Sequence, residues 1–150
     1  MKKIILILLF FSFLGTLKAQ ENIAFTFNHL ALSVKNLDES VTFYKDVLQL
    51  EEITNKAKIE GIRWFSLGEG KELHLISFLK EPVTFNKAIH LALSTSNFDA
   101  FVKTLEAKKI SYSNWPGKAN KINVRVDGIK QIYFQDPSKY WIEVNSVNQK

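Results

Sequence analysis

Two short segments of alternating apolar and polar residues organise the chain. Residues 29–33 read His-Leu-Ala-Leu-Ser, and residues 90–94 repeat the same five residues. Side chains alternate between the two faces of a β-strand, so in each copy the leucines share one face and the histidine shares the other with Ala and Ser. An Asn follows each copy at the same distance, as Asn36 and Asn97. Because the repeat occurs only twice, we interpret the chain as a duplicated half-domain and not as a solenoid, which needs at least three units.

A helix is predicted after each copy. Asn36 with Glu39 three residues later is typical of a helix start, because the Asn side chain accepts a hydrogen bond from the free backbone N–H groups there. In the second half, Ser96 and Asp99 form a capping-box pattern. Apolar stripes at helical spacing follow each start. The stripes are Leu37, Val41, Tyr44 and Leu48 in the first helix and Phe98, Phe101 or Val102, and Leu105 in the second.

The remaining periodic segments predict strands. They lie at residues 50–58, 62–67, 72–79, 110–114, 124–126, 129–135 and 140–147. Residues 68–71, Gly-Glu-Gly-Lys, form a plausible hairpin turn because glycine adopts positive φ without strain. Residues 81–86 are the one candidate linker. The order strand, helix, three strands occurs twice, so we expect an α+β fold of two βαβββ modules, at about residues 25–80 and 87–147. Their strands would form a curved mixed sheet around a cup, with the helices outside.

The first twenty residues have a different character. Two lysines precede an apolar run at residues 4–14, and Leu17-Lys18-Ala19 follows. This pattern resembles a secretory signal cleaved after Ala19. The alternative is a membrane anchor, but the run is much shorter than the ~20 apolar residues of a spanning helix. We therefore expect a signal peptide at residues 1–19, a single domain at residues 20–150, a secreted or periplasmic location, and no membrane contact after removal of the signal.

Composition narrows the classes of partner. The chain has 150 residues, of which 46% are hydrophobic, so one domain with a full core is expected. Removal of Lys2, Lys3 and Lys18 with the signal leaves the remaining basic residues only slightly in excess of the 15 acidic ones. No basic run of the kind that follows a phosphate backbone is present, which argues against nucleic acid. The absence of cysteine excludes disulfides, a Cys-based metal site and a thiol nucleophile.

The last predicted strand of each module also carries one polar residue between two apolar ones. These residues are His74 and Glu143. By alternation both should project from the face opposite their apolar neighbours, toward the cup. Together with His29 and His90 they give four inward candidates, which include every histidine of the chain. Imidazole nitrogens with one carboxylate suit Zn²⁺, Ni²⁺, Fe²⁺ or Mn²⁺.

The order and spacing of these segments resemble the vicinal oxygen chelate superfamily. This superfamily includes glyoxalase I, methylmalonyl-CoA epimerase, extradiol dioxygenases and the fosfomycin- and bleomycin-resistance proteins. The segments that carry the resemblance are residues 29–33, 37–48, 73–75, 89–93, 134–137 and 141–144. They include Phe43-Tyr44 in the first predicted helix and Asp136-Pro137 before the last predicted strand, and they extend over nearly all of the mature chain. The resemblance implies the fold of two βαβββ modules and a divalent transition metal in the cup.

Carried over residue by residue, the metal positions of the superfamily fall on His29, His74, His90 and Glu143. One position departs from the known patterns. Glyoxalase I usually has Glu where this chain has His74, and extradiol dioxygenases use only the set that matches His29, His90 and Glu143. Three roles therefore stay open for His74: a fourth ligand, a catalytic base, or a group that supports the ligands.

Three further residues are candidates for substrate binding. Arg125 and Tyr133 would hold a substrate carboxylate or oxyanion, because Arg is a fixed bidentate donor. Trp141 shares a face with Glu143 by the period of two and would form an apolar wall. The plainer alternatives are a solvated Arg, a packed Tyr and a Trp that fills the core.

The resemblance implies a lyase or isomerase of the glyoxalase I type. Two adjacent oxygens of a small substrate would chelate the metal, and Glu143 or His74 would take a carbon-bound proton to give an enediolate. Two alternatives stay open: an extradiol-type dioxygenase with Fe²⁺ on His29, His90 and Glu143, and a small-molecule-binding protein of the bleomycin-resistance kind without catalysis. Members of the superfamily often build their cups from paired chains, so we expect a homodimer.

Overall fold

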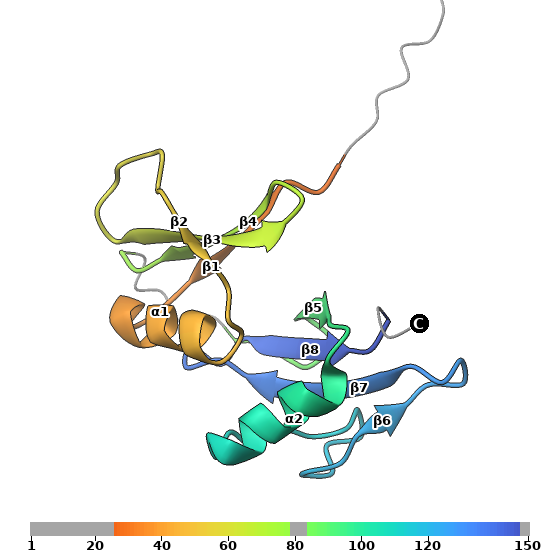
Figure 1. Ribbon diagram of the computed structural model, residues 1–150. Helices are drawn as coiled ribbons and strands as arrows, with labels where there is room; N and C mark the ends of the chain where they lie inside the picture. The colour runs from red at the N-terminus through yellow and green to blue at the C-terminus, as the bar shows by residue number, and fades with distance from the viewer. Residues whose placement is uncertain (1–25, 79–83, 148–150) are drawn as a thin grey trace, which may run out of the picture.

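The structure is a computed structural model that describes residues 26–78 and 84–147 (Figure 1). The expected signal peptide at residues 1–19 lies outside the described residues, as does the beginning of the predicted linker at Glu81 and Pro82. Neither helix within the described ranges has the length and apolar character needed to cross a membrane.

The first module contains five elements in the predicted order. They are β1 (His29–Ser33), α1 (Leu37–Asp46), β2 (Glu52–Ile53), β3 (Ile62–Gly68) and β4 (Lys71–Ile76). The sheet order is β1-β4-β3-β2, with β1 parallel to β4 and the other pairs antiparallel. Asn36 caps α1 as predicted, since its Oδ1 accepts from the backbone N–H of Glu39 at 3.2 Å. Gly68 and Gly70 both have positive φ in the hairpin between β3 and β4, which confirms that turn.

The second module repeats this arrangement. It contains β5 (His90–Ser94), α2 (Phe98–Ala107), β6 (Asn123–Val124), β7 (Lys130–Gln135) and β8 (Trp141–Asn145). The sheet order β5-β8-β7-β6 corresponds strand for strand to the first sheet. The predicted α+β fold of two βαβββ modules is confirmed, but the strands form two separate four-stranded sheets. Figure 1 shows the first module above the second, with α1 between the two sheets.

Three local predictions were wrong. The strand expected at residues 50–58 is limited to β2, because the Asn55 side chain bonds the carbonyls of Ile59 and Ile62 and the N–H of Ala57, which favours a turn. The segment at residues 110–114 forms isolated bridges at Ser113 and no strand. Helix α2 begins after Asn97, whose side chain makes no cap bond, so the expected capping box does not form.

The core joins both modules through the helices. The buried faces of the sheets carry Leu32, Leu73, Leu75, Ile132, Phe134, Ile142 and Val144, and the helices add Val41, Phe43, Tyr44, Phe98, Val102 and Leu105. These residues form one cluster, and the rings of Phe43 in α1 and Phe134 in β7 lie 6.3 Å apart. The apolar positions that alternation assigned to one face of each sheet therefore lie inside, which leaves the polar positions on the other face.

A buried hydrogen bond fixes the two modules to each other. Tyr44 in α1 donates from its hydroxyl to Oδ2 of Asp136, in the turn between β7 and β8, at 3.0 Å, and both side chains are almost fully buried. Burial raises the pKa of both groups. The backbone N–H of Ser33 also donates to the hydroxyl of Tyr140 at 2.9 Å. The corner between β1 and α1 is thus held on the turn that precedes β8.

We expect Tyr44→Phe to lower the free energy of unfolding by about 1–3 kcal/mol, because it removes the side-chain donor to Oδ2 of a buried carboxyl. Urea denaturation followed by circular dichroism measures this change. Tyr112→Phe is the matched control, since the Tyr112 hydroxyl donates at 2.9 Å to Glu106, an exposed carboxylate. The control should lose less than about 1 kcal/mol. An equal loss of unfolding free energy in both variants would contradict a special role of the Tyr44–Asp136 hydrogen bond between the modules.

Candidate metal centre

The predicted site residues lie on the polar faces of the two sheets. His29 and His74 project from the first sheet, where the register places Ala31 of β1 beside His74 of β4. His90 and Glu143 project from the second sheet, where Ala92 of β5 lies beside Glu143 of β8. The apolar neighbours of His74 and Glu143 are buried on the helix side, as alternation predicted.

Within one chain these four residues form two pairs and not one centre. The rings of His29 and His74 stack at 4.5 Å, and Nε2 of His90 lies 3.3 Å from Oε2 of Glu143. Over the described residues, no group of three or more His, Asp or Glu is close enough to hold a metal ion. The expectation that a single chain brings all four to a common point is therefore not met, because each module keeps its own pair on its own sheet.

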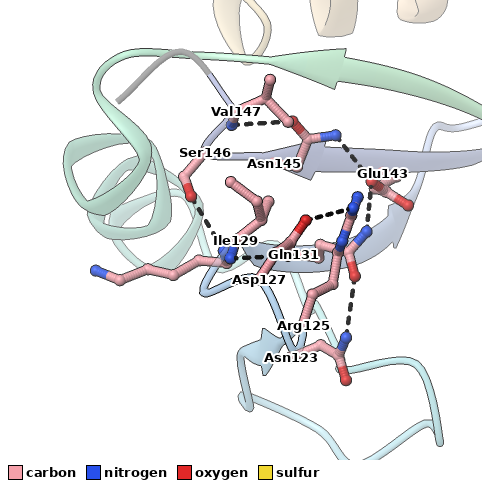
Figure 2. A network of polar contacts seen from close by, with 10 residues as sticks. Asn123, Arg125, Asp127, Ile129, Gln131, Glu143, Asn145, Ser146 and Val147 are labelled. Carbon is pink, nitrogen blue, oxygen red and sulfur yellow. Dashed lines mark hydrogen bonds and ion pairs between the residues drawn. The ribbon is translucent and has the colours of Figure 1, made fainter. Parts of the chain in front are cut away.

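Glu143 is fixed by a network of donors (Figure 2). Its Oε1 accepts from Gln131 Nε2 at 2.8 Å and from Asn145 Nδ2 at 2.9 Å. Its Oε2 accepts from the Tyr133 hydroxyl at 2.7 Å. Burial by itself would raise the pKa of Glu143, but the hydrogen bonds from Asn145, Tyr133 and Gln131 outweigh it and hold the pKa below its usual value. Glu143 is thus an ionised carboxylate that hydrogen bonds hold in place on the polar face of the second sheet.

The hydrogen bonds of His90 define which ring nitrogen is available. Nδ1 lies 2.9 Å from the backbone carbonyl of Lys87. A carbonyl only accepts, so Nδ1 is the donor of this bond, and Nε2 is the ring nitrogen that faces Oε2 of Glu143. Two acceptors at this distance repel each other unless a cation lies between them. Two atoms bound at ~2.1 Å to one metal ion would lie roughly 3.0–3.4 Å apart, so the observed 3.3 Å fits a shared metal as well as a shared proton.

His29 has the same arrangement on the first sheet. Its Nδ1 lies 2.7 Å from Oδ1 of Asn28, and the side chain is exposed. With Nδ1 as the donor, the Nε2 lone pair of His29 points away from this bond and has no hydrogen-bond partner in the part of the chain that the structure describes. In both His29 and His90, Nδ1 makes the bond to a neighbouring acceptor, so Nε2 is the nitrogen that a metal would bind.

His74 is different because its Nε2 is already occupied. This nitrogen lies 2.8 Å from Oε2 of Glu72, to which it donates. The ring is also sandwiched between His29 at 4.5 Å and Trp64 at 4.1 Å, both nearly parallel to it. Of the three roles open for His74, this geometry favours a group that supports His29 over a fourth ligand.

The predicted substrate-binding residues all lie near the second pair. Tyr133 donates to Glu143, and burial together with this bond raises the pKa of Tyr133, so it stays a protonated donor. Arg125 pairs with Asp127 at 2.6 Å, and its positive charge acts on Tyr133 (Figure 2). Trp141 lies opposite His90 in the register of β5 and β8.

Sequence reasoning missed several members of this surface. Gln131 lies two residues before Tyr133 in β7, and Asn145 lies two residues after Glu143 in β8, so each pair shares a face and the period of two could have found them. Lys87 lies in the turn before β5 and not in a strand, so the period of two does not identify it as a member of this surface. Its Nζ lies 4.7 Å from the centre of the Trp141 ring and 5.5 Å from that of Tyr133.

Comparison with known proteins gives a consistent result. The model of the "Glyoxalase/Bleomycin resistance protein/Dioxygenase superfamily" matches residues 26–144. The metallothiol transferase FosB of Shouchella clausii (strain KSM-K16) is 34% identical over 125 residues, which cover 79% of this chain and 78% of that protein.

Solved structures share the fold. A glyoxalase/dioxygenase from Nostoc punctiforme superposes with a TM-score of 0.63 at 26% identity and covers 81% of this chain and 90% of its own. A lactoylglutathione lyase from Agrobacterium tumefaciens superposes with a TM-score of 0.60 at 21% identity and covers 87% of this chain and 96% of its own.

The different states of the histidines lead to a prediction on metal affinity. His90→Ala removes a free lone pair, so we expect the affinity for Zn²⁺ or Co²⁺ to fall by more than about 100-fold. His74→Ala removes a ring that supports His29 and whose Nε2 is already bonded, so a smaller loss, of about tenfold, is expected. Titration calorimetry with a competing chelator measures both, and circular dichroism checks that each variant is folded. Equal losses would place His74 among the ligands.

Proposed function

Because the chain belongs to the Glyoxalase/Bleomycin resistance protein/Dioxygenase superfamily, we propose that it is a metal-dependent enzyme that transfers a thiol to a small, oxygen-bearing molecule. The observation that carries the proposal is the pair of facing acceptors, His90 Nε2 and Glu143 Oε2, whose separation fits one shared divalent ion. The proposal also includes export, as the first nineteen residues led us to expect.

The donor set suits a divalent transition metal. Two imidazoles and one carboxylate would come from His29, His90 and Glu143, and Zn²⁺, Ni²⁺, Fe²⁺ and Mn²⁺ all accept such ligands. Such a metal supplies a Lewis acid that polarises a substrate oxygen. The Tyr133 hydroxyl and the Lys87 carbonyl fix the ligands Glu143 and His90 by hydrogen bonds. Arg125 attracts a negatively charged group of the substrate.

We further propose that His29 comes from a second copy of the chain. The polar face that carries His29 is bordered by exposed apolar residues, Phe27 and Phe78, which continue the alternation of β1 and β4. Val147 does the same beyond β8 on the face of Glu143. Exposed apolar side chains around a polar face are typical of a surface that another chain covers. Pairing of the two faces would place His29 of one copy at His90 and Glu143 of the other.

The hydrogen bonds favour thiol transfer over the lyase or isomerase reaction. An enediolate reaction needs a base for a carbon-bound proton, but the carboxylate of Glu143 already accepts hydrogen bonds from three donors, and its pKa is lowered. His74 already donates from Nε2 to Glu72.

In a thiol transfer, the sulfur of a thiolate forms a bond to an electrophilic carbon, a carbon–oxygen bond breaks, and the oxygen takes a proton. The thiol must be a second substrate because the chain has no cysteine. The name of the relative, metallothiol transferase, supports this class.

An Fe²⁺-dependent dioxygenase is the second candidate. Two histidines and one carboxylate with open coordination positions are typical of non-haem Fe²⁺ oxygenases. The set His29, His90 and Glu143, without His74, is of this kind. Oxygen uptake that depends strictly on Fe²⁺ would distinguish this reaction from thiol transfer.

The test of the proposal is an assay of turnover with defined thiol and electrophile substrates. We expect the metal-loaded protein to join L-cysteine to a small epoxide that carries a carboxylate or phosphonate, with loss of the product after chelation of the metal. Mass spectrometry of the product measures this reaction, and the folded His90→Ala variant is the control. Catechol cleavage with oxygen uptake would favour the dioxygenase. Tight binding of such a ligand by metal-free protein, with no turnover, would contradict both enzyme proposals and favour a binding protein.

A second prediction concerns the charge of the substrate. If Arg125 holds an anionic group, Arg125→Met should raise the KM for the anionic electrophile about tenfold or more with little change in kcat, as expected for the loss of a charge-assisted hydrogen bond. Arg63→Met is the matched control, because Arg63 pairs with Glu52 away from the polar face. A change in kcat alone, or the same change in both variants, would contradict a substrate-binding role.

A further inference from the structure

Lys87 connects two segments beside the proposed metal centre. It lies in the turn before β5, and its Nζ donates to three acceptors: the Ser113 hydroxyl at 3.1 Å, the Asn114 carbonyl at 3.1 Å and the Trp115 carbonyl at 3.2 Å. An ammonium group has three N–H donors, so all of them are used. The side chain of Lys87 therefore ties the turn before β5 to residues 113–115.

The surroundings of this ammonium group are neutral. Nζ lies above the rings of Trp141 and Tyr133, and no ion pair with Asp or Glu is formed by Lys87 over residues 26–78 and 84–147. Partial burial lowers its pKa. Aromatic faces and carbonyl oxygens stabilise a cation at such a position. The contacts specify one place for this side chain, unlike those of a lysine on an open surface.

The backbone of Lys87 contacts a proposed metal ligand directly. Its carbonyl accepts from Nδ1 of His90 at 2.9 Å. The turn that presents this carbonyl is closed by Asn86, which accepts from the N–H groups of Ala88 and Ile89. Asn86, Ala88 and Ile89 are all exposed, so the turn has little packing of its own. Within residues 86–89, the Lys87 side chain makes the contacts with the sheet face, and just before the turn the ring of Phe85 lies 4.0 Å from that of Tyr140.

We propose that Lys87 is a positioning residue of the metal centre. Its side chain holds the turn in place, and its carbonyl thereby keeps the proton of His90 on Nδ1 and leaves Nε2 free for the metal. The same three bonds hold Trp115, whose ring lies 6.4 Å from that of His90 and 5.4 Å from that of Tyr133, as a wall of the site. This inference deepens the proposed function and rests on it for the metal, but the effect on the His90 ring exists without metal.

The test compares Lys87→Met with Lys118→Met. Lys118 is an exposed lysine a few residues from Trp115, so its loss controls for charge alone. In metal-free protein, the ¹⁵N shifts of the His90 ring measure the share of each tautomer. At a pH at which the His90 ring is neutral, we expect wild type and Lys118→Met to hold the proton on Nδ1, and Lys87→Met to show a mixture. The affinity for Co²⁺ should fall about tenfold in Lys87→Met and stay unchanged in Lys118→Met.

The outcomes separate this inference from the proposed function. Wild-type protein that binds no Co²⁺ would contradict the metal centre, while the ring shifts would still decide the role of Lys87. Unchanged ring shifts in a folded Lys87→Met protein would overturn the inference. If Lys87→Met does not fold, Ser113→Ala replaces it, because this variant removes only one of the three acceptors. A shift of the His90 tautomers in the same direction, smaller in size, is then expected, and the absence of any shift would overturn the inference.

Discussion

Two hydrogen-bond acceptors that face each other define the chemistry of this protein. Nε2 of His90 and Oε2 of Glu143 lie 3.3 Å apart, and each is held in place by other bonds. The Lys87 carbonyl fixes the proton of His90 on the far nitrogen, and the Tyr133 hydroxyl fixes the carboxylate. Neither group can turn away without the loss of these bonds. A shared proton or a shared metal ion removes the repulsion between the two atoms, and the fit of their 3.3 Å separation to one divalent ion is the physical basis of the proposed metal centre.

The duplicated fold explains why only half of a centre forms on each module. The repeat places His29 and His90 at the same position of equivalent strands, each with Nδ1 bonded to a nearby acceptor. The last strands differ, however, because β4 carries His74 and β8 carries Glu143. His74 forms a stacked and hydrogen-bonded group with Trp64 and Glu72, whereas Glu143 stays next to His90. The first sheet thus offers one free imidazole, and the second offers an imidazole with a carboxylate.

Much of this arrangement could be predicted from the sequence, and the reasons for the rest are physical. Alternation placed His74 and Glu143 on the polar faces because burial of the neighbouring apolar residues fixes the register of β4 and β8. The same period could also have identified Gln131 and Asn145. Periodicity says nothing about how two sheets lie relative to each other, so the separation of the two pairs was not foreseen. The role of Lys87 was missed for a similar reason, since it depends on a turn and on residues 113–115, which follow no period.

The most direct test of the account is complementation between subunits. His29→Ala and His90→Ala chains with different tags are co-expressed, and the mixed dimer is purified and titrated with Co²⁺. The account predicts that neither variant alone binds the ion tightly, whereas each mixed dimer regains one intact site, from His29 of one chain and His90 and Glu143 of the other. A mixed dimer that binds no more Co²⁺ than the separate variants, or a wild-type protein that binds the ion as a monomer, would contradict it.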